Sequence, residues 1–168
     1  PPPPIAIDET LLDVVTCAAR LSPRLRRNHN FHTADTDVCH RLLNGMEPGS
    51  YILPHRHLDP DKDETFVVLR GAFGLVLFDD AGEVAQMLLL RAGGTTLGAT
   101  VPSGTWHTLI AFEPGGVFLE AKAGPYLPLS DAERAPWAPA EGDAAAADYL
   151  EALTARFESL FGQRTGWA

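Results

Sequence analysis

Between Val38 and Lys122 the chain shows only strand signals, and this stretch limits the fold more than any other feature of the sequence. Residues 65–78 are dense in Val, Leu and Phe, and turn-forming segments such as 79–82 and 113–116 separate the apolar runs. Several short strands that are joined by turns, with no helices between them, predict an antiparallel sandwich or barrel.

Helical patterns occur only towards the two ends of the chain. Near the N-terminus, Asp8 or Thr10 can cap an amphipathic helix that ends at Ser22, because the proline that follows drives this residue out of the helical region. Near the C-terminus, Asp143 can cap a helix with one apolar face that stops at Gly162. The sequence therefore predicts an all-β fold with a flanking helix at each end.

The length and composition fit one domain. The chain has 168 residues, of which 45% are hydrophobic, so it can bury one sizeable core. Within that single domain we expect an N-terminal tail and helix over residues 1–37, a barrel over 38–124, and a proline-rich wrap with the C-terminal helix over 125–168.

Charge and cysteine content restrict the partners and the compartment. The formal net charge is −9 and no basic stripe is present, which argues against nucleic acid and anionic membranes as partners. No apolar run approaches the roughly 18 residues that a membrane span needs. Cys17 and Cys39 have no metal-site spacing and form no disulfide framework. We expect both to be reduced and buried in a cytoplasmic protein.

Three histidines and one carboxylate form the most informative chemical pattern: His55, His57, Glu64 and His107. In a strand, side chains two residues apart point the same way, so His55 and His57 share one face. Imidazoles mixed with a carboxylate suit a divalent transition metal such as Zn, Fe, Ni or Mn. Four protein ligands leave positions open on a metal that takes five or six, which is typical of a catalytic or ligand-binding centre.

The same residues resemble the two cupin motifs. The first motif, G-x5-H-x-H-x(3,4)-E-x6-G, falls on Gly49, His55, His57, Glu64 and Gly71. The second, G-x5-P-x-G-x2-H-x3-N, falls on Pro102, Gly104 and His107. The resemblance implies a cupin-like antiparallel β-barrel, or jelly roll, with the three histidines and the glutamate as metal ligands.

The chain departs from these motifs at three places. Six residues separate His57 from Glu64, where the motif has three or four, so Asp61 is an alternative carboxylate ligand. The preserved distance to Gly71 favours Glu64. The last Asn of the second motif is replaced by Ala111, and its leading Gly falls on a threonine.

A wider resemblance runs from about Arg24 to Asp143. Segments such as Pro54-His-Arg-His, Thr105-Trp-His-Thr and Glu120-Ala-Lys-Ala-Gly-Pro resemble the WbuC-type cupin-fold metalloproteins. That family is associated with polysaccharide gene clusters. The resemblance implies a fold and a metal more directly than it implies a reaction.

Strand parity adds two candidate catalytic residues. Tyr51 shares the parity of His55 and His57, and it is a candidate general acid or substrate hydrogen bonder. Its ordinary alternative is a rim aromatic with the hydroxyl in water. Arg70 shares the parity of Glu64 and is a candidate clamp for a carboxylate or phosphate. Its ordinary alternative is an ion pair at a strand end.

These observations predict a metal-binding cupin that acts as an enzyme on a small oxygen-rich substrate, such as a sugar or sugar nucleotide in polysaccharide biosynthesis. The reaction classes in view are metal-dependent isomerase, epimerase and oxygenase. Two alternatives stay open: a non-catalytic sensor or carrier, and a metal-free epimerase-like cupin. A small-molecule ligand is the expected partner, and the proline-led N-terminus is compatible with a homodimer.

Overall fold

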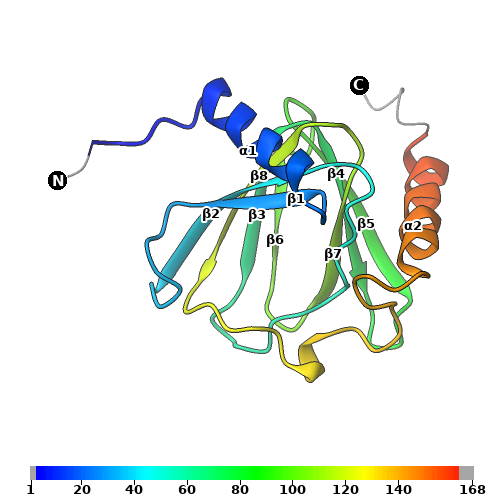
Figure 1. The fold of residues 1–168 in the computed structure, drawn as a ribbon. Coiled ribbons are helices and arrows are strands. Elements are labelled where there is room, and N and C mark those ends of the chain that lie inside the picture. Colours follow the sequence, from blue (N-terminus) through cyan, green and yellow to red (C-terminus); the bar gives the residue numbers. More distant parts are fainter. Residues whose placement is uncertain (1–2, 163–168) are drawn as a thin grey trace.

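The computed structural model of the chain describes residues 3–162, so residues 1, 2 and 163–168 of the predicted terminal segments lie outside the described residues. The strands form two antiparallel sheets (Figure 1). The five-stranded sheet has the order β1 (Arg26–Asn30), β2 (Cys39–Met46), β8 (Gly116–Ala123), β3 (Glu64–Arg70), β6 (Gly98–Val101). The three-stranded sheet has the order β5 (Val84–Arg91), β4 (Ala72–Phe78), β7 (Trp106–Ala111).

The strand order is that of a jelly roll. A single bridge between His55 and His107 places the segment around His55 beside β7, at the free edge of the three-stranded sheet. From β2 to β8 the chain then crosses repeatedly between the two sheets, and strands distant in sequence, such as β2 and β8, pair antiparallel. Two interleaved Greek keys of this kind define the jelly-roll fold. The predicted fold class is confirmed.

Alternation along the strands sorts the side chains into an interior and two outer faces. The inward side chains form an apolar cluster between the sheets that includes Phe66, Val68, Phe73, Leu75, Leu109 and Phe118. Their sequence neighbours point outwards, where two helices cover them. The interior of the barrel is therefore lined by the inward-facing side chains of the two sheets.

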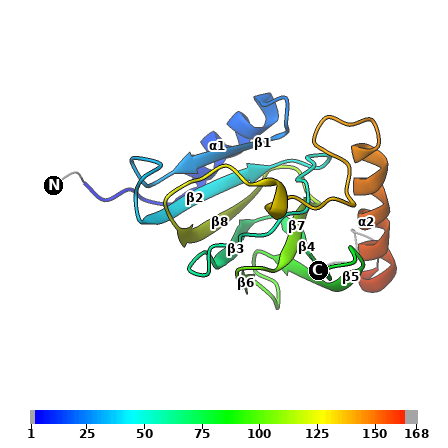
Figure 2. The same ribbon diagram turned by 90° about the horizontal axis from the view of Figure 1, so that it is seen from below.

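Each helix lies on the outer face of one sheet (Figures 1 and 2). Helix α1 (Glu9–Leu21) is capped by Asp8, whose carboxylate accepts a hydrogen bond from the amide of Leu11 at 2.9 Å. It packs on β1 and β2, and a Cβ at Gly45 would lie 2.8 Å from the Val15 carbonyl oxygen, so glycine permits this close approach.

Helix α2 (Ala146–Phe161) covers the three-stranded sheet in the same manner. Here a Cβ at Gly74 would lie 2.5 Å from the ring of Phe157, which is fully buried. A short 3-10 helix, η1 (Asp131–Glu133), interrupts the segment that leads from β8 to α2.

Two local predictions are wrong. Asp143 does not cap α2, because a turn intervenes: the amide of Ala146 donates to the Asp143 carbonyl, and the Asp143 carboxylate accepts from the amide of Ala140. Cys17 and Cys39 are free but exposed, since Cys17 lies on the outward side of α1 and Cys39 begins β2 at the rim.

Candidate metal centre

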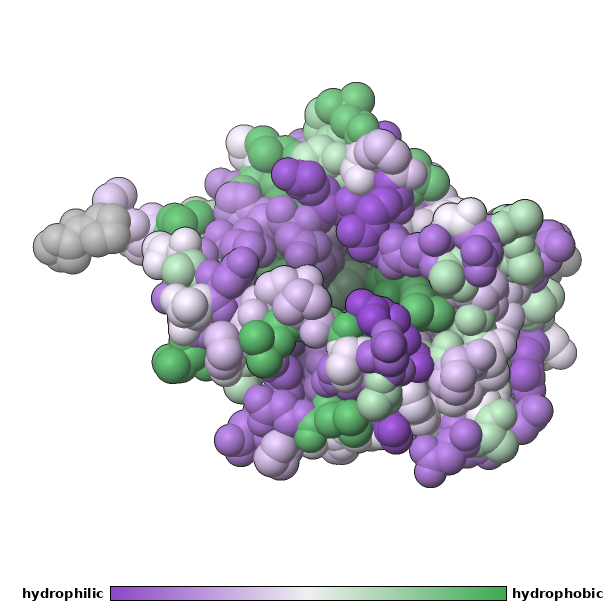
Figure 3. Space-filling view, turned by 60° about the horizontal axis from the view of Figure 1, so that its bottom comes forward, coloured by the Kyte–Doolittle hydropathy of each residue, from purple (hydrophilic) through white to green (hydrophobic). Residues whose placement is uncertain are grey.

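The interior of the barrel opens into a cavity at one end. Its volume is about 630 Å³, within the range of small-molecule sites. Figure 3 shows the hollow, with hydrophilic residues along much of its rim. Apolar side chains line part of the wall: Leu42, Phe66, Leu109 and Phe118. Polar side chains line the rest: Asn28, Asn30, Asn44, Glu120, Lys122 and Arg134.

Three elements position the predicted metal ligands, of which His55, Glu64 and His107 line this cavity. His55 and His57 lie on the connection between β2 and β3, which is not a regular strand. His55 is held by a pair of backbone hydrogen bonds with His107, of 3.0 and 2.9 Å. His107 is the second residue of β7, and Glu64 is the first residue of β3. His55, Glu64 and His107 therefore lie at the start of a strand or beside one, whereas His57 lies on the irregular connection.

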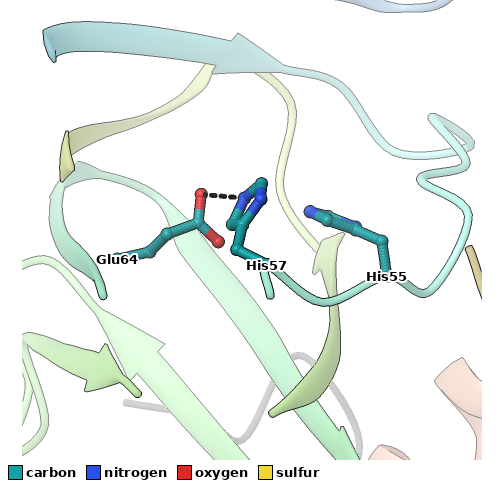
Figure 4. A group of neighbouring side chains, drawn as sticks. All are labelled: His55, His57 and Glu64. Carbon is teal, nitrogen blue, oxygen red and sulfur yellow. Dashed lines mark ion pairs between the residues drawn. The ribbon is translucent and has the colours of Figure 1, made fainter. Parts of the chain in front are cut away.

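The four predicted ligands lie together. The ligand atoms of His55, His57 and Glu64 are all within 4.8 Å of one another (Figure 4). His57 Nε2 is 3.2 Å from one carboxylate oxygen of Glu64, and His107 Nε2 is 2.8 Å from the other. Asp61, the alternative carboxylate, is exposed on the loop that precedes β3. The geometry thus favours Glu64 over Asp61.

Two of the histidines are oriented by the backbone. His55 Nδ1 is 3.0 Å from the Leu53 carbonyl oxygen, and His107 Nδ1 is 2.9 Å from that of Thr105. Because a carbonyl oxygen only accepts, Nδ1 is the donor in each contact, and Nε2 is the nitrogen that faces the cluster. Metal-ligating histidines are commonly fixed through their second nitrogen in this way.

The donor atoms of the cluster fit a cation. His57 Nε2, His107 Nε2 and Glu64 Oε2 are buried and make no hydrogen bond of regular geometry among the described residues, and each faces another donor atom of the cluster. Unpaired buried polar atoms are uncommon because burial without a partner costs free energy. A divalent ion would satisfy all three atoms at once.

The electrostatics favour the metal-binding protonation states. Burial, with a further contribution from the neighbouring His107, lowers the pKa of His55 to about 3, so this imidazole is neutral at neutral pH. Burial alone would raise the pKa of Glu64. However, the contacts with His107 and His57 and the charge of Lys122 hold that pKa well below its usual range. A neutral imidazole and an ionised carboxylate are the forms that bind metals.

Lys122 is a neighbour of the cluster whose contacts the sequence does not reveal. Its ammonium nitrogen lies 2.8 Å from Glu64 Oε1 and 2.6 Å from Glu120 Oε1. Asn44 donates a hydrogen bond of 2.8 Å to the other oxygen of Glu120. Parity along β8 places Glu120 and Lys122 on one face, but only the pairing of β3 with β8 puts Lys122 opposite Glu64.

The structure does not bring Tyr51 to the centre. The Tyr51 hydroxyl donates a hydrogen bond of 2.7 Å to the Pro139 carbonyl, and the ring makes an edge contact with Tyr149. The chain from Tyr51 to His55 is irregular and passes through Pro54, so the two-residue alternation that linked them does not hold. Tyr51 instead packs against the apolar residues between the three-stranded sheet and α2.

Arg70 lies on the outer face of the five-stranded sheet, away from the cavity. Its guanidinium forms ion pairs with Glu9 and with Asp13 of α1, the latter at 2.8 Å. The pairing of β3 with β8 shifts by one residue between Val68 and Arg70. Such a bulge reverses the parity of the residues that follow, and it turns Arg70 outwards.

Comparison with known proteins gives a family and a set of distant structural likenesses. The family described as "Domain of unknown function (DUF6016)" matches residues 7–90, which is half of the chain. None of the curated proteins matches the chain. No helix among residues 3–162 is long and apolar enough to cross a membrane.

The solved structures that resemble the chain include the following three. KdgF from Halomonas sp. is 18% identical with a TM-score of 0.49, and the match covers 61% of this chain and 82% of that one. A cupin-2 domain containing protein from Shewanella frigidimarina is 19% identical (TM-score 0.44; 58% and 80% covered). Oxalate decarboxylase from Bacillus subtilis is 18% identical (TM-score 0.46; 64% and 26% covered). All three TM-scores are below 0.5, so these likenesses carry no argument about the fold. The strand order of the chain itself identifies the fold.

Proposed function

We propose that this chain, which belongs to the family described as domain of unknown function (DUF6016), is a cupin that binds one divalent transition metal. The ligands in this proposal are His55, His57, Glu64 and His107. The observation that carries it is that three buried donor atoms without a regular hydrogen bond face one another in the barrel interior. The metal identity within Zn, Fe, Ni and Mn is left to experiment.

We further propose that the metal serves an enzyme for a small oxygen-rich substrate, such as a sugar or sugar nucleotide. When bound, the ion would supply a Lewis acid to a carbonyl or hydroxyl group. The chain contributes the surroundings: amides of Asn28, Asn30 and Asn44 line the cavity beside Glu120. Directed donors and acceptors of this kind suit hydroxyl-bearing ligands, since an apolar ligand would leave them unpaired.

The finer assignments rest on sequence resemblance. The WbuC-type segments support a place in polysaccharide biosynthesis, and isomerase, epimerase and oxygenase are the reaction classes that we propose to test. A non-catalytic sensor or carrier is the second candidate. It is favoured by a specific observation: Tyr51 and Arg70 are both engaged outside the cavity.

The metal assignment is tested by metal analysis and by the substitution His57→Ala. The variant should bind Zn²⁺ or Mn²⁺ more than about 100-fold more weakly, because loss of a direct ligand exceeds the 10- to 100-fold cost of losing an outer-shell partner. Circular dichroism should be unchanged, since apolar burial stabilises the barrel. His29→Ala is the matched control, because His29 lies on β1 and contacts Phe31.

Unchanged metal affinity in His57→Ala would refute the proposed centre. Loss of the fold together with the metal would make the ion structural. Incubation of the metal-loaded protein with sugars and sugar nucleotides then separates the two functions: an enzyme converts one of them, whereas a carrier binds it and releases it unchanged.

A further inference from the structure

We infer that Lys122 is an internal counter-ion that competes with the metal for Glu64, and that Glu120 is the second carboxylate which retains Lys122 once the metal is bound. This inference rests on the proposed metal-binding function and concerns how strongly the centre holds its ion.

The competition follows from the register of the five-stranded sheet. Lys122 on β8 is paired directly with Glu64 on β3, so both side chains enter the cavity at the same level. Cross-strand partners on one face are close neighbours. The Lys122 ammonium reaches Glu64 Oε1, the oxygen that also faces His57 Nε2 at 3.2 Å. Glu64 Oε1 is therefore in contact with the Lys122 ammonium and also faces the proposed metal position.

A metal ion and the ammonium cannot both stay at that oxygen without repulsion. Side-chain exposure is 3% for Glu64 and 19% for Lys122, so solvent screens the two cations only weakly. The charges near the centre also favour competition. Glu64, Glu120 and Lys122 together carry one negative charge, and removal of the lysine charge would leave two negative charges to attract a divalent ion.

Glu120 provides a place for the displaced ammonium. Its Oε1 already lies 2.6 Å from Lys122, and its Oε2 is held by the hydrogen bond from Asn44. Lysine has a flexible stem and a compact charge, so it can leave Glu64 and keep Glu120 without movement of the backbone. The arrangement keeps the ionised Glu64 paired before the metal arrives, at the expense of affinity.

The test measures Zn²⁺ affinity by chelator competition for the wild-type chain and for Lys122→Met, Glu120→Gln and the double variant. Lys122→Met should bind Zn²⁺ about 10- to 100-fold more tightly, a change of the size that removal of an outer-shell group usually causes but in the opposite direction. Glu120→Gln should bind more weakly, because Lys122 then has only Glu64. In the Lys122→Met background the effect of Glu120→Gln should shrink, since the competitor is gone.

Two further variants control for charge and folding. Lys62→Met removes another buried lysine, one that donates to the Pro125 carbonyl and not to the cluster, and its affinity should match the wild type. Lys122→Gln keeps a polar donor without charge, and it should show the same tightening if Lys122→Met folds poorly.

Equal or weaker Zn²⁺ binding in both uncharged Lys122 variants would overturn the inference, because Lys122 would then support Glu64 rather than compete for it. Absence of Zn²⁺ binding in every variant and in the wild type would instead refute the proposed function, and the inference with it.

Discussion

The two ends of the barrel interior are built by the same strands with the same alternation, but their side chains differ in kind. Along β3 the inward positions run from Glu64 at the open end, through Phe66 in the cavity wall, to Val68 at the closed end. Along β7 they run from His107 to Leu109. The two-residue alternation decides which side chains point into the barrel. The residue type at each inward position then decides whether that level of the barrel is an apolar core or a polar site.

The difference has an energetic side. At the closed end, Phe73 and Leu75 are fully buried, and burial of a large apolar side chain contributes about 1.5–3 kcal/mol. At the open end, Glu64 is buried and Lys122 is 19% exposed, and the cost of desolvating these charges is offset by their pairing with each other and with Glu120. Apolar burial at the closed end therefore provides most of the stability. This stability offsets the cost of the buried charged groups at the open end.

The largest expected effect is on the closed end. Phe73→Ala should lower the free energy of unfolding by about 3–5 kcal/mol, because it removes an aromatic ring from a fully buried position next to Phe118. Urea denaturation measures the loss, and the exposed Val38→Ala should change the free energy by less than about 0.5 kcal/mol. If the folded Phe73→Ala protein also lost its metal affinity, the two ends would not be independent.

A smaller effect is expected where the structure places the two predicted catalytic residues. Tyr51→Phe removes the hydrogen bond to Pro139 and should cost about 1 kcal/mol. Arg70→Ala removes exposed ion pairs to α1 and should cost about 0.2–1 kcal/mol. Neither should change the affinity for Zn²⁺ by calorimetric titration. A marked change in Zn²⁺ affinity for either variant would mean that the residue contributes to the metal centre although it lies outside the cavity.

The smallest effect concerns the rim beside His57. Hydrogen bonds from the amide and hydroxyl of Ser130, with a further one from the amide of Leu58, lower the pKa of Glu133 to about 2. Because the folded pKa lies below the ordinary value of 4.5, the stability from Glu133 is present above about pH 4.5 and is lost as the pH falls towards 2.

Glu133→Gln should therefore lower the free energy of unfolding at pH 7 by no more than about 1 kcal/mol, the usual scale of a capping interaction. Urea denaturation of both proteins at pH 7 and pH 3 should show that the difference narrows at the lower pH. A constant difference would mean that Glu133 acts through packing and not through its charge.

Much of this molecule is encoded locally. Apolar alternation and turn residues between Val38 and Lys122 predict an antiparallel β fold, and the amphipathic ends predict both helices. The cupin-like spacing of His55, His57, Glu64 and His107 predicts a ligand set that the structure gathers in one place. Such features depend on period and spacing, which a single chain displays without reference to distant segments.

What only the tertiary structure decided depends on how distant strands meet. A bulge in the pairing of β3 with β8 turned Arg70 outwards, and an irregular approach to Pro54 separated Tyr51 from the histidines. The same pairing placed Lys122 against Glu64, across 58 positions of sequence. Register between strands is set by the sum of side-chain contacts over both faces, so no local pattern around Lys122 or Arg70 specifies which partner each one meets.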